Sequence, residues 1–468
     1  MTPLQIAPLG MAAEVDLSGE PIRLSRSVWA LLAGGAGAAL GWFASETGAW
    51  SWDASVNGRY ALAFMLLVLA WRVVPCSFSR GLLVAGWVSA ATAMIPSAWT
   101  RFFGQEASPL AGVAVWLSVA ICVGSAAAAG DFVSRRWMGR WGASMGFAGA
   151  VLLTSIPPVG LIGMALPWVA AGAMFPRTGV AGYALLILIG ALAAGLPGRP
   201  TAAARAERLW QKHGRPLVLV MLASTGLMIA VQVMSSFRAA VEGQPIATIT
   251  VEMNGPPPLP GGSKWFDLQD RFKREAVAAI EQGSRTVVLP EGSVSFWDHG
   301  ASMYWADLAQ LARVRHAQVL VGAYLPSGGS EHGLQAMDNT LLELPSGKVY
   351  PARANLPVGM FRPWARSGLT FPLGVEPWSK KGIAMLEFGE VLYTICYEEV
   401  LLWPLAMASV QSGSPKAIVS AASNWFLPVG KWHSQERMIQ LQARLYGLPL
   451  ARSVVYGNAE KRRGGTNG

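Results

Sequence analysis

The sequence predicts an N-terminal α-helical membrane bundle with several spans, followed by a C-terminal layered α/β domain. Three observations support this fold class. Hydrophobic residues make up 52% of the 468 residues and charged residues only 14%, where about a quarter is usual. The apolar residues before position 236 gather in runs close to the ~20 residues that a bilayer crossing needs. After position 244, short β-branched runs alternate with amphipathic stretches, the pattern of a mixed sheet with helices.

The membrane half begins after a polar leader, residues 1–26, which we expect in the cytoplasm. Six clear apolar spans are predicted: 27–45, 58–75, 81–99, 110–130, 179–197 and 216–235. A longer apolar region, 142–175, is broken by Pro157 and Pro158. That region crosses the membrane once with an additional re-entrant piece, or it forms a tight hairpin.

The placement of arginine residues favours a single crossing for 142–175. With one crossing, the basic loops near residues 72–80, 135–140 and 199–215 all fall on the cytoplasmic side. The prediction is therefore about seven spans over 27–236, with the C-terminal domain on the periplasmic side of a bacterial inner membrane. This placement also accounts for the net charge of +10, so no direct nucleic-acid partner is predicted. Acidic residues are nearly absent from the spans, which argues against a proton-coupled transporter.

The C-terminal half, residues 244–457, shows alternating strand and helix signals, and residues 458–468 are expected to form a flexible polar tail. Strands are predicted at 246–251, 286–289, 318–324, 339–344, 348–353, 383–388, 391–395, 417–420 and 451–455. Helices are predicted at 265–280, 304–315 and 432–446. Glycine and proline turns suggest that some neighbouring strands form antiparallel hairpins.

Cys396 stands at the end of the strand 391–395, and Glu398, Glu399 and a helix-like apolar run follow it. A strand that turns sharply into a helix holds a thiol at the tip of a sheet, where the helix N-terminus stabilises a thiolate. This is the geometry of a cysteine nucleophile. The alternative is a cysteine that is buried as a small apolar residue.

Two other landmarks follow predicted strand ends. Pro290 ends one strand and places Glu291 at the sheet edge, where a carboxylate serves as a general base for a thiol; the alternative is a solvated turn acid. Residues 350–359 contain Arg353. The three cysteines suggest no disulfide framework, and no metal-ligand cluster is visible, so neither a metal nor a cofactor is expected.

These landmarks carry a resemblance to a known family. Pro290-Glu291, the stretch 350–359 and Ile395-Cys396-Tyr397-Glu398 occur in the order found in the carbon–nitrogen hydrolase (nitrilase) superfamily. The N-terminal bundle narrows the resemblance to apolipoprotein N-acyltransferase. Further matching segments are 251–254, 423–426, His433, Gln435 and 447–452.

The resemblance implies an α-β-β-α sandwich and a thioester mechanism. Cys396 would attack an acyl ester, Glu291 would accept the thiol proton, and the Tyr397 amide with Arg353 would stabilise the oxyanion. Glu398 and Asn424 would be supporting residues. The implied partners are a phospholipid acyl donor, a lipoprotein-type amine acceptor and membrane lipid.

The chain also departs from the family pattern. The family has a catalytic lysine two residues after a tyrosine and three residues before a leucine. Counting back from Leu356 gives Arg353, counting forward from Tyr350 gives Ala352, and neither position is a lysine. Arginine supplies positive charge but does not readily shuttle a proton. The family glutamate that follows is Met360 here. Two alternatives therefore stay open: a catalytically weak or inactive membrane component of a conjugation or assembly system, and a membrane-anchored amidase.

Overall fold

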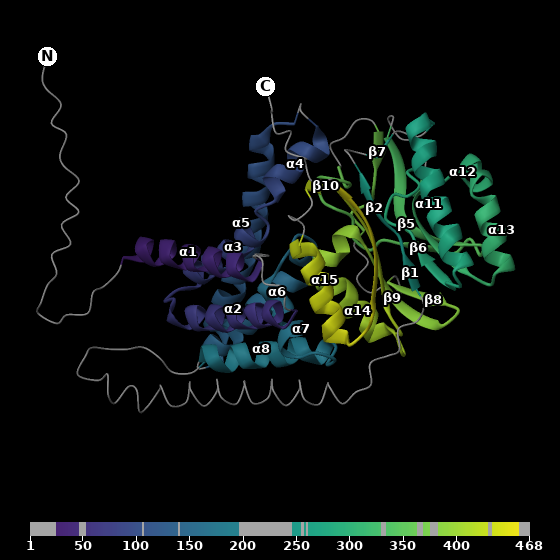
Figure 1. The fold of residues 1–468 in the computed structure, drawn as a ribbon. Coiled ribbons are helices and arrows are strands. Elements are labelled where there is room, and N and C mark those ends of the chain that lie inside the picture. Colours follow the sequence, from purple (N-terminus) through teal and green to yellow (C-terminus); the bar gives the residue numbers. More distant parts are fainter. Residues whose placement is uncertain are drawn as a thin grey trace, which may run out of the picture.

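The computed structural model describes residues 25–45, 53–104, 107–138, 141–195, 246–253, 257–258, 261–328, 334–362, 368–374, 382–428 and 433–457. These form an α-helical part, up to residue 195, and a mixed α/β part from residue 246, placed side by side (Figure 1). Most of the predicted leader, the predicted span 216–235 and the predicted tail 458–468 lie outside the described residues.

The helical part contains eight α-helices in the described ranges. They are α1 (Arg26–Ser45), α2 (Asp53–Val73), α3 (Ser77–Ala91), α4 (Ile95–Phe103), α5 (Pro109–Trp137), α6 (Gly142–Ser155), α7 (Ala170–Met174) and α8 (Val180–Gly195). Among the described helices, α1 and α5 are long and apolar enough to cross a membrane, and α3 with α4 adds a third if that bent pair is one span. This supports a membrane region, with fewer helices of spanning length than the roughly seven spans predicted.

Two predicted spans differ from the structure. The run 81–99 is not one helix, because α3 and α4 meet at a 49° bend. In the region 142–175, α6 has 14 residues and is about 21 Å long at 1.5 Å per residue, too short for a bilayer core of ~30 Å. The chain then breaks at Pro157-Pro158 and continues through two 3₁₀ turns, η2 (Val159–Leu161) and η3 (Pro167–Val169), into α7.

A buried ion cluster ties α3 to α5. Asp131 is fully buried and accepts hydrogen bonds from Arg80 Nη1 at 2.9 Å, Arg135 Nε at 2.9 Å and Ser77 Oγ at 2.7 Å. Arg80 also donates to the carbonyl oxygens of Trp71 and Val74. Two of the arginines behind the orientation prediction therefore have a local structural role. Buried charges of this kind are tolerated because they are paired and hydrogen-bonded.

The α/β part contains two sheets. One has the order β1 (Ile246–Thr248), β3 (Thr286–Val288), β4 (Gln318–Pro326), β5 (Leu334–Leu344), β6 (Val349–Pro351), with β7 (Gly368–Thr370) also paired to β5. The other has the order β2 (Thr250–Met253), β11 (Leu450–Gly457), β10 (Ile418–Pro428), β9 (Gly389–Ile395), β8 (Ile383–Leu386). The predicted hairpins, β5–β6 and β8–β9, are antiparallel.

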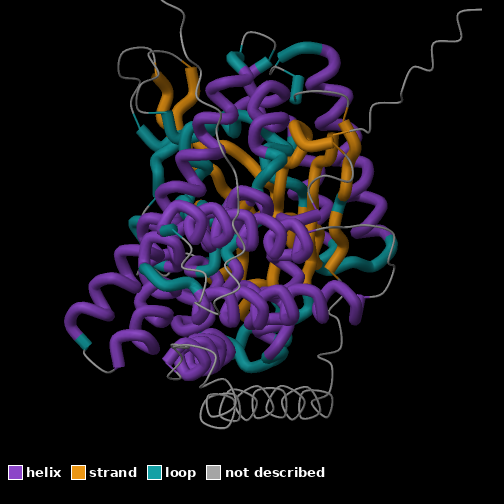
Figure 2. The backbone as a smooth tube through the Cα atoms, turned by 90° about the vertical axis from the view of Figure 1, so that its left-hand side faces the viewer, coloured by secondary structure: helices purple, strands orange, loops and turns teal. Residues whose placement is uncertain are grey.

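The layers run helix, sheet, sheet, helix, in the order predicted. Val288, Leu320 and Leu341 of the first sheet pack against Tyr393 and Val419 of the second. The outer face of the first sheet is covered by α11 (Ser263–Glu281), α12 (His299–Tyr304) and α13 (Ala306–Val314). The second is covered by α14 (Trp403–Gln411) and α15 (His433–Tyr446). Figure 1 shows that the helical part lies on the side of α14 and α15, and in Figure 2, turned by 90°, helices lie in front of the strands.

The predicted strand 246–251 is divided between the two sheets. β1 pairs with β3 in the first sheet, and β2 pairs with β11 in the second. Between them, Ile249 donates its N–H to Val288 O and accepts a hydrogen bond at its carbonyl from Ser453 Oγ. The chain therefore crosses from one sheet to the other within one residue, and this crossing joins the two sheets at one edge.

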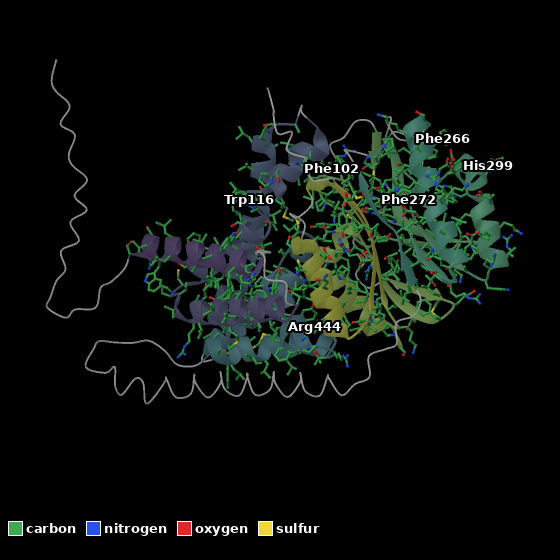
Figure 3. The ribbon with its side chains drawn as sticks, in the orientation of Figure 1. Phe102, Trp116, Phe266, Phe272, His299 and Arg444 are labelled. Carbon is green, nitrogen blue, oxygen red and sulfur yellow. The ribbon has the colours of Figure 1, made fainter. Side chains whose placement is uncertain are left out.

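One hydrophobic core continues across the boundary between the two parts. It includes Trp168 of the helical part together with Trp403, Leu441 and Leu445 of the α/β part. Backbone hydrogen bonds cross the same boundary, from Arg177 N to Arg444 O at 2.9 Å and from Gly179 N to Leu445 O at 2.8 Å. Arg444 is labelled at this junction in Figure 3. The helical part is thus packed against the domain directly, rather than tethered to it.

We predict that Gly172→Ala loosens this junction. A Cβ at Gly172 would lie 1.9 Å from the Leu441 carbonyl oxygen, so α7 and α15 must separate, which costs about 1–3 kcal/mol for an overpacked site. Thermal unfolding of the detergent-solubilised protein measures this loss. Gly35→Ala in α1 is the matched control, because nothing lies within 4 Å of a Cβ there. Equal unfolding temperatures for the two variants would contradict the prediction.

Candidate active site

Cys396 sits in a strained turn at the end of a buried strand. The apolar residues of β9 pair in parallel with β10, up to Ile395 opposite Ala421. Cys396 then takes a φ of +46° and begins a short 3₁₀ helix, η6 (Cys396–Val400). A positive φ is uncommon for a residue other than glycine, and such strain clusters at functional sites. The turn holds the thiol beyond the sheet edge.

Glu398 fixes the shape of this turn. Its side chain is fully buried. One carboxylate oxygen accepts hydrogen bonds from the backbone N–H groups of Arg353, at 2.6 Å, and Ala354, at 3.2 Å. The other accepts from the backbone N–H of Ile395 at 3.0 Å. The carboxylate therefore ties the residue before Cys396 to the segment 353–354, a positioning role for a residue predicted to orient groups near the thiol.

Glu399 forms a second clamp, which the sequence did not predict. Arg452 binds both of its oxygens, through Nε at 2.7 Å and Nη2 at 2.9 Å. Ser420 Oγ donates to one oxygen at 2.5 Å and Gln435 Nε2 to the other at 2.7 Å. Gln435 Nε2 also donates to the Cys396 carbonyl oxygen at 3.2 Å. Residues from four elements thus fix the backbone of the cysteine turn.

Glu291 lies against the thiol. It follows β3, is only 3% exposed, and accepts a hydrogen bond from Asn339 Nδ2 at 2.7 Å. Burial raises the pKa of the Glu291 carboxyl to about 7, while hydrogen bonds from the Cys396 thiol, Asn339 and the Ser423 backbone N–H partly offset that rise. The reading of Glu291 as a solvated turn acid is therefore wrong. A carboxyl poised near neutral pH is suited to proton transfer.

The Cys396 thiol is held in its neutral form. Burial raises its pKa well above the usual value, and the neighbouring Glu291 charge raises it further. The predicted thiolate, stabilised by a helix N-terminus, does not form because η6 has only five residues and an anionic carboxylate adjoins the sulfur. The arrangement fits a neutral thiol that loses its proton to Glu291 as it attacks.

Two further residues near this pair were missed by the sequence interpretation. Asn339 comes from β5 and holds Glu291. Tyr324, from β4, is partly buried. Desolvation raises the pKa of its hydroxyl, and the charges of Glu291 and Cys396 raise that pKa further. Neither residue lies in a local motif. Only the pairing of Tyr324 with Asn339 across the β4–β5 ladder brings them to the site, so sequence spacing alone gave no signal.

Arg353 is not placed where the sequence interpretation put it. Its guanidinium is 1% exposed and pairs with Glu398 Oε1 at 3.3 Å. It also donates to the carbonyl oxygens of Pro404 and, at 2.9 Å, Tyr393. All three contacts face the interior behind β9, and Arg353 does not line the cavity beside Cys396. The predicted oxyanion-stabilising role of Arg353 is therefore wrong for this geometry, and its role is to hold the Glu398 clamp.

An apolar cavity of about 390 Å³ opens beside Cys396. Its walls come from both parts of the protein: α4, α5 and the loop 162–164 on one side, and residues 356–359, η6 and the end of β10 on the other. Tyr397, Asn424 and Gln435 line it with Cys396. The Tyr397 hydroxyl donates to Leu161 O at 2.6 Å, so the predicted supporting residues Tyr397 and Asn424 do lie beside the thiol.

Aromatic side chains close the cavity between α4 and β10. Phe102 stacks on Trp425 with ring centroids 5.8 Å apart and meets Phe426 edge-on at 5.3 Å. Figure 3 labels Phe102 at this junction of the two parts. On α5, Ser118 and Cys122 line the cavity and are exposed. Leu117 and Ile121 beside them are 44% and 62% exposed. The cavity therefore reaches the apolar outer surface of α5.

The described residues offer no obvious metal centre, since nowhere among them do three or more His, Cys, Asp or Glu side chains gather.

Comparison with known proteins finds relatives along most of the chain. It is similar to "Conjugal transfer protein TraB" of Agrobacterium fabrum, 25% identical over 422 residues, which cover 82% of this chain and 85% of the relative. It is also similar to "Probable conjugal transfer protein TraB" of Sinorhizobium fredii, 25% identical over 413 residues, covering 84% and 91%. The sequence also suggests TraB of bacterial plasmids as the specific resemblance, and these two relatives carry that name. No family model matches the chain.

Solved structures show a weaker similarity. A mutant amidase of Nesterenkonia sp. AN1 carrying acrylamide at its active-site cysteine is 13% identical, with a TM-score of 0.32, over 45% of this chain and 79% of the amidase. A second mutant, described as an amidase from the nitrilase superfamily, is 15% identical with a TM-score of 0.31, over 46% and 77%. The evidence for the two-sheet sandwich is therefore the pairing of the strands in this chain.

We predict that Glu291→Gln stabilises the protein at pH 8. The folded-state pKa of about 7 lies above the ordinary value of 4.5, so the folded state binds more protons between these values and its stability falls as pH rises through this window. Above pH 7 the buried carboxylate destabilises the fold by on the order of 3 kcal/mol, from 1.36 kcal/mol per pKa unit. Thermal unfolding at pH 8 and pH 4.5 measures the difference. A variant no more stable than wild type at pH 8 would contradict it.

We predict that Arg452→Met destabilises the fold strongly. It leaves the fully buried Glu399 without its cationic partner, and breaking a buried pair costs about 3–5 kcal/mol. Denaturant unfolding measures the loss. Arg452→Lys keeps the charge but loses the two-oxygen contact, so its loss should be smaller. Equal stabilities of wild type and Arg452→Met would show that Glu399 does not depend on Arg452.

Proposed function

We propose that the protein is a membrane-associated enzyme of the carbon–nitrogen hydrolase type that transfers acyl groups through a thioester on Cys396. The observation that carries this proposal is the contact of the Cys396 thiol with the Glu291 carboxyl at the wall of an apolar cavity. A nucleophile beside a base within hydrogen-bond reach is the signature of covalent catalysis.

The proposed reaction has two halves. The sulfur attacks the acyl carbonyl, the thiol proton passes to Glu291, and the leaving alcohol or amine takes that proton as the tetrahedral intermediate collapses. An amine then attacks the thioester and gives up its proton to Glu291, and the thiol recovers that proton as it leaves. The Tyr397 backbone amide is a proposed oxyanion donor, because it follows the nucleophile directly. The cysteine returns to its starting state after each turnover.

We propose a phospholipid as the acyl donor and a lipoprotein-type N-terminal amine as the acceptor. Support comes from the cavity, which is lined mainly by apolar side chains of α4 and α5 and reaches the exposed apolar surface of α5. The helix α5 has 29 residues and contains an apolar stretch long enough to cross a membrane, which suits contact with lipid. The relatives named for conjugal transfer support a role for this acyl transfer in plasmid conjugation.

The α/β part is proposed to face the periplasm. Support is limited to the arginine distribution along the sequence, as argued from the positive-inside rule. A phosphatase fused after residue 457 reports the side directly, since the enzyme is active only when exported. An active phosphatase fusion supports a periplasmic α/β part. An inactive phosphatase fusion, together with activity of a reporter that works only in the cytoplasm when fused at the same position, contradicts it.

A second candidate function is a binding or assembly component with weak or no turnover. The observation that favours it is the position of Arg353, which falls at one of the two possible places of the family lysine yet pairs with Glu398 behind the site. An amidase acting on small amides is the remaining alternative, and it would form the same thioester from an amide substrate.

We predict that full-length protein in phospholipid bilayers with labelled acyl chains acquires an acyl-thioester on Cys396. Mass spectrometry of the cysteine peptide, and release by hydroxylamine, identify it. Cys396→Ser should abolish the label, while Cys122→Ser, which removes the exposed thiol at the cavity edge, should keep it. A label absent from wild type in bilayers and with activated esters would leave the binding component as the better function.

The same assay carries a pH prediction. Glu291 must be ionised to accept the thiol proton, so the initial rate should rise with pH with an apparent pKa of about 7. Glu291→Gln should lower the rate by about 10²–10⁴-fold, the usual contribution of a general base. A rate independent of pH between 5 and 9 would exclude Glu291 as that base.

A further inference from the structure

With Arg353 turned away, the site needs another donor for the oxyanion. A tetrahedral intermediate on Cys396 would be stabilised by donors about 3 Å from its oxygen. Most polar side chains beside the thiol are already committed. Gln435 Nε2 donates hydrogen bonds to the Glu399 carboxylate and the Cys396 carbonyl oxygen, and the Tyr397 hydroxyl donates to the Leu161 carbonyl oxygen.

Asn424 differs from these neighbours. It is 0% exposed, it lines the cavity, and neither its Oδ1 nor its Nδ2 has a hydrogen-bond partner among the described residues. Leaving a buried polar group unsatisfied costs about 1–3 kcal/mol. Native proteins rarely keep such groups without a reason, and a missing ligand is one of those reasons. Because neither Oδ1 nor Nδ2 is hydrogen-bonded to another described residue, the Asn424 carboxamide is able to rotate and direct its NH₂ group toward the cavity.

The backbone places Asn424 next to the reacting sulfur. The preceding residue, Ser423, offers its backbone N–H to both the Cys396 thiol and the Glu291 carboxylate, lowering the pKa of each. Asn424 is therefore one residue from an atom that contacts the nucleophile. Its own position on β10 is fixed by pairing with Tyr456 of β11, just before the register shifts between Asn424 and Pro428.

One other cavity-lining side chain has a buried unpartnered donor, the Trp99 indole Nε1. Trp99 belongs to α4, in the helical part, and packs against Phe103 with ring centroids 4.3 Å apart. It does not adjoin the Ser423 contact with Cys396. The Trp99 side chain as a whole is only partly buried, and it lies on the opposite wall of the cavity from Asn424.

We propose that the Asn424 carboxamide donates a hydrogen bond to the oxyanion formed when Cys396 attacks an acyl carbonyl. This rests on the acyl-transfer function proposed above and assigns to a neutral amide the role expected of a cation at Arg353. As the carbon–sulfur bond forms, the carbonyl π electrons move to oxygen and the thiol proton moves to Glu291. Asn424 Nδ2–H stabilises that oxygen until the carbonyl re-forms and the leaving group departs with the proton.

The test compares two reactions of the same thiol in the full-length protein in detergent, with Cys76 and Cys122 replaced by serine. A 4-nitrophenyl fatty acyl ester reports acylation, which passes through an oxyanion. Methyl methanethiosulfonate reports thiol reactivity, which forms none. Asn424→Leu removes the donor at similar volume, and Asn424→Ala does so with less bulk should the leucine variant fail to fold. Trp265→Phe is the control, because it removes a buried indole N–H that has no partner among the described residues and does not line the cavity.

The expected result is acylation slowed by about 10²–10³-fold in the Asn424 variants, the loss typical of one oxyanion donor. Their reaction with the thiosulfonate should be unchanged, and Trp265→Phe should match wild type in both reactions. Acylation of the Asn424 variants at the wild-type rate overturns the proposal. Equal loss of both reactions overturns it too, since Asn424 would then only position the turn. A wild-type thiol that reacts with the thiosulfonate but never acylates overturns the proposed function, and this inference with it.

Discussion

The contact between the Cys396 thiol and the Glu291 carboxyl is the interaction on which the rest of this structure depends. Burial raises the pKa of both groups, and the Glu291 charge raises the pKa of the thiol further, while the thiol hydrogen bond partly offsets the rise at Glu291. The thiol therefore keeps its proton at neutral pH, beside a carboxyl that titrates at about 7. Such a pair is unstable by itself, and much of the surrounding structure serves to keep it assembled.

Two buried carboxylates perform that work without touching the reacting atoms. Glu398 accepts hydrogen bonds from the backbone N–H groups of Arg353 and Ile395. Glu399 binds Arg452 and Gln435, and Gln435 also donates to the Cys396 carbonyl oxygen. The helical part adds a third support, since Tyr397 is bonded to Leu161 and one hydrophobic core spans both parts. A cavity wall built from α4 and α5 then brings apolar surface directly to the nucleophile. Membrane association and the site chemistry are therefore structurally coupled.

Much of this arrangement was predictable from sequence, because it follows from local patterns. The strand that ends at Cys396, the turn that places Glu291 at the sheet edge and the alternating elements after residue 244 all carry periodicity or turn signals. What the sequence did not reveal depends on long-range placement. Arg353 lies at the expected place in the chain, but a buried carboxylate at Glu398 draws its side chain behind β9. Residues 246–251 look like one strand, yet two different partners, β3 and β11, divide it. Likewise the bend between α3 and α4 is hidden within one apolar run.

The central claim is that Glu291 and Cys396 form one coupled proton site, and infrared difference spectroscopy tests it most directly. The carboxyl stretch of wild type minus Glu291→Gln, followed against pH, isolates the protonated Glu291 side chain. The account predicts a protonated band that disappears with a midpoint of about 7 and that moves to higher pH in Cys396→Ala, where the thiol hydrogen bond to the carboxylate is lost. A Glu291 carboxyl that is fully ionised at pH 5, or whose titration is unaffected by loss of Cys396, would contradict it.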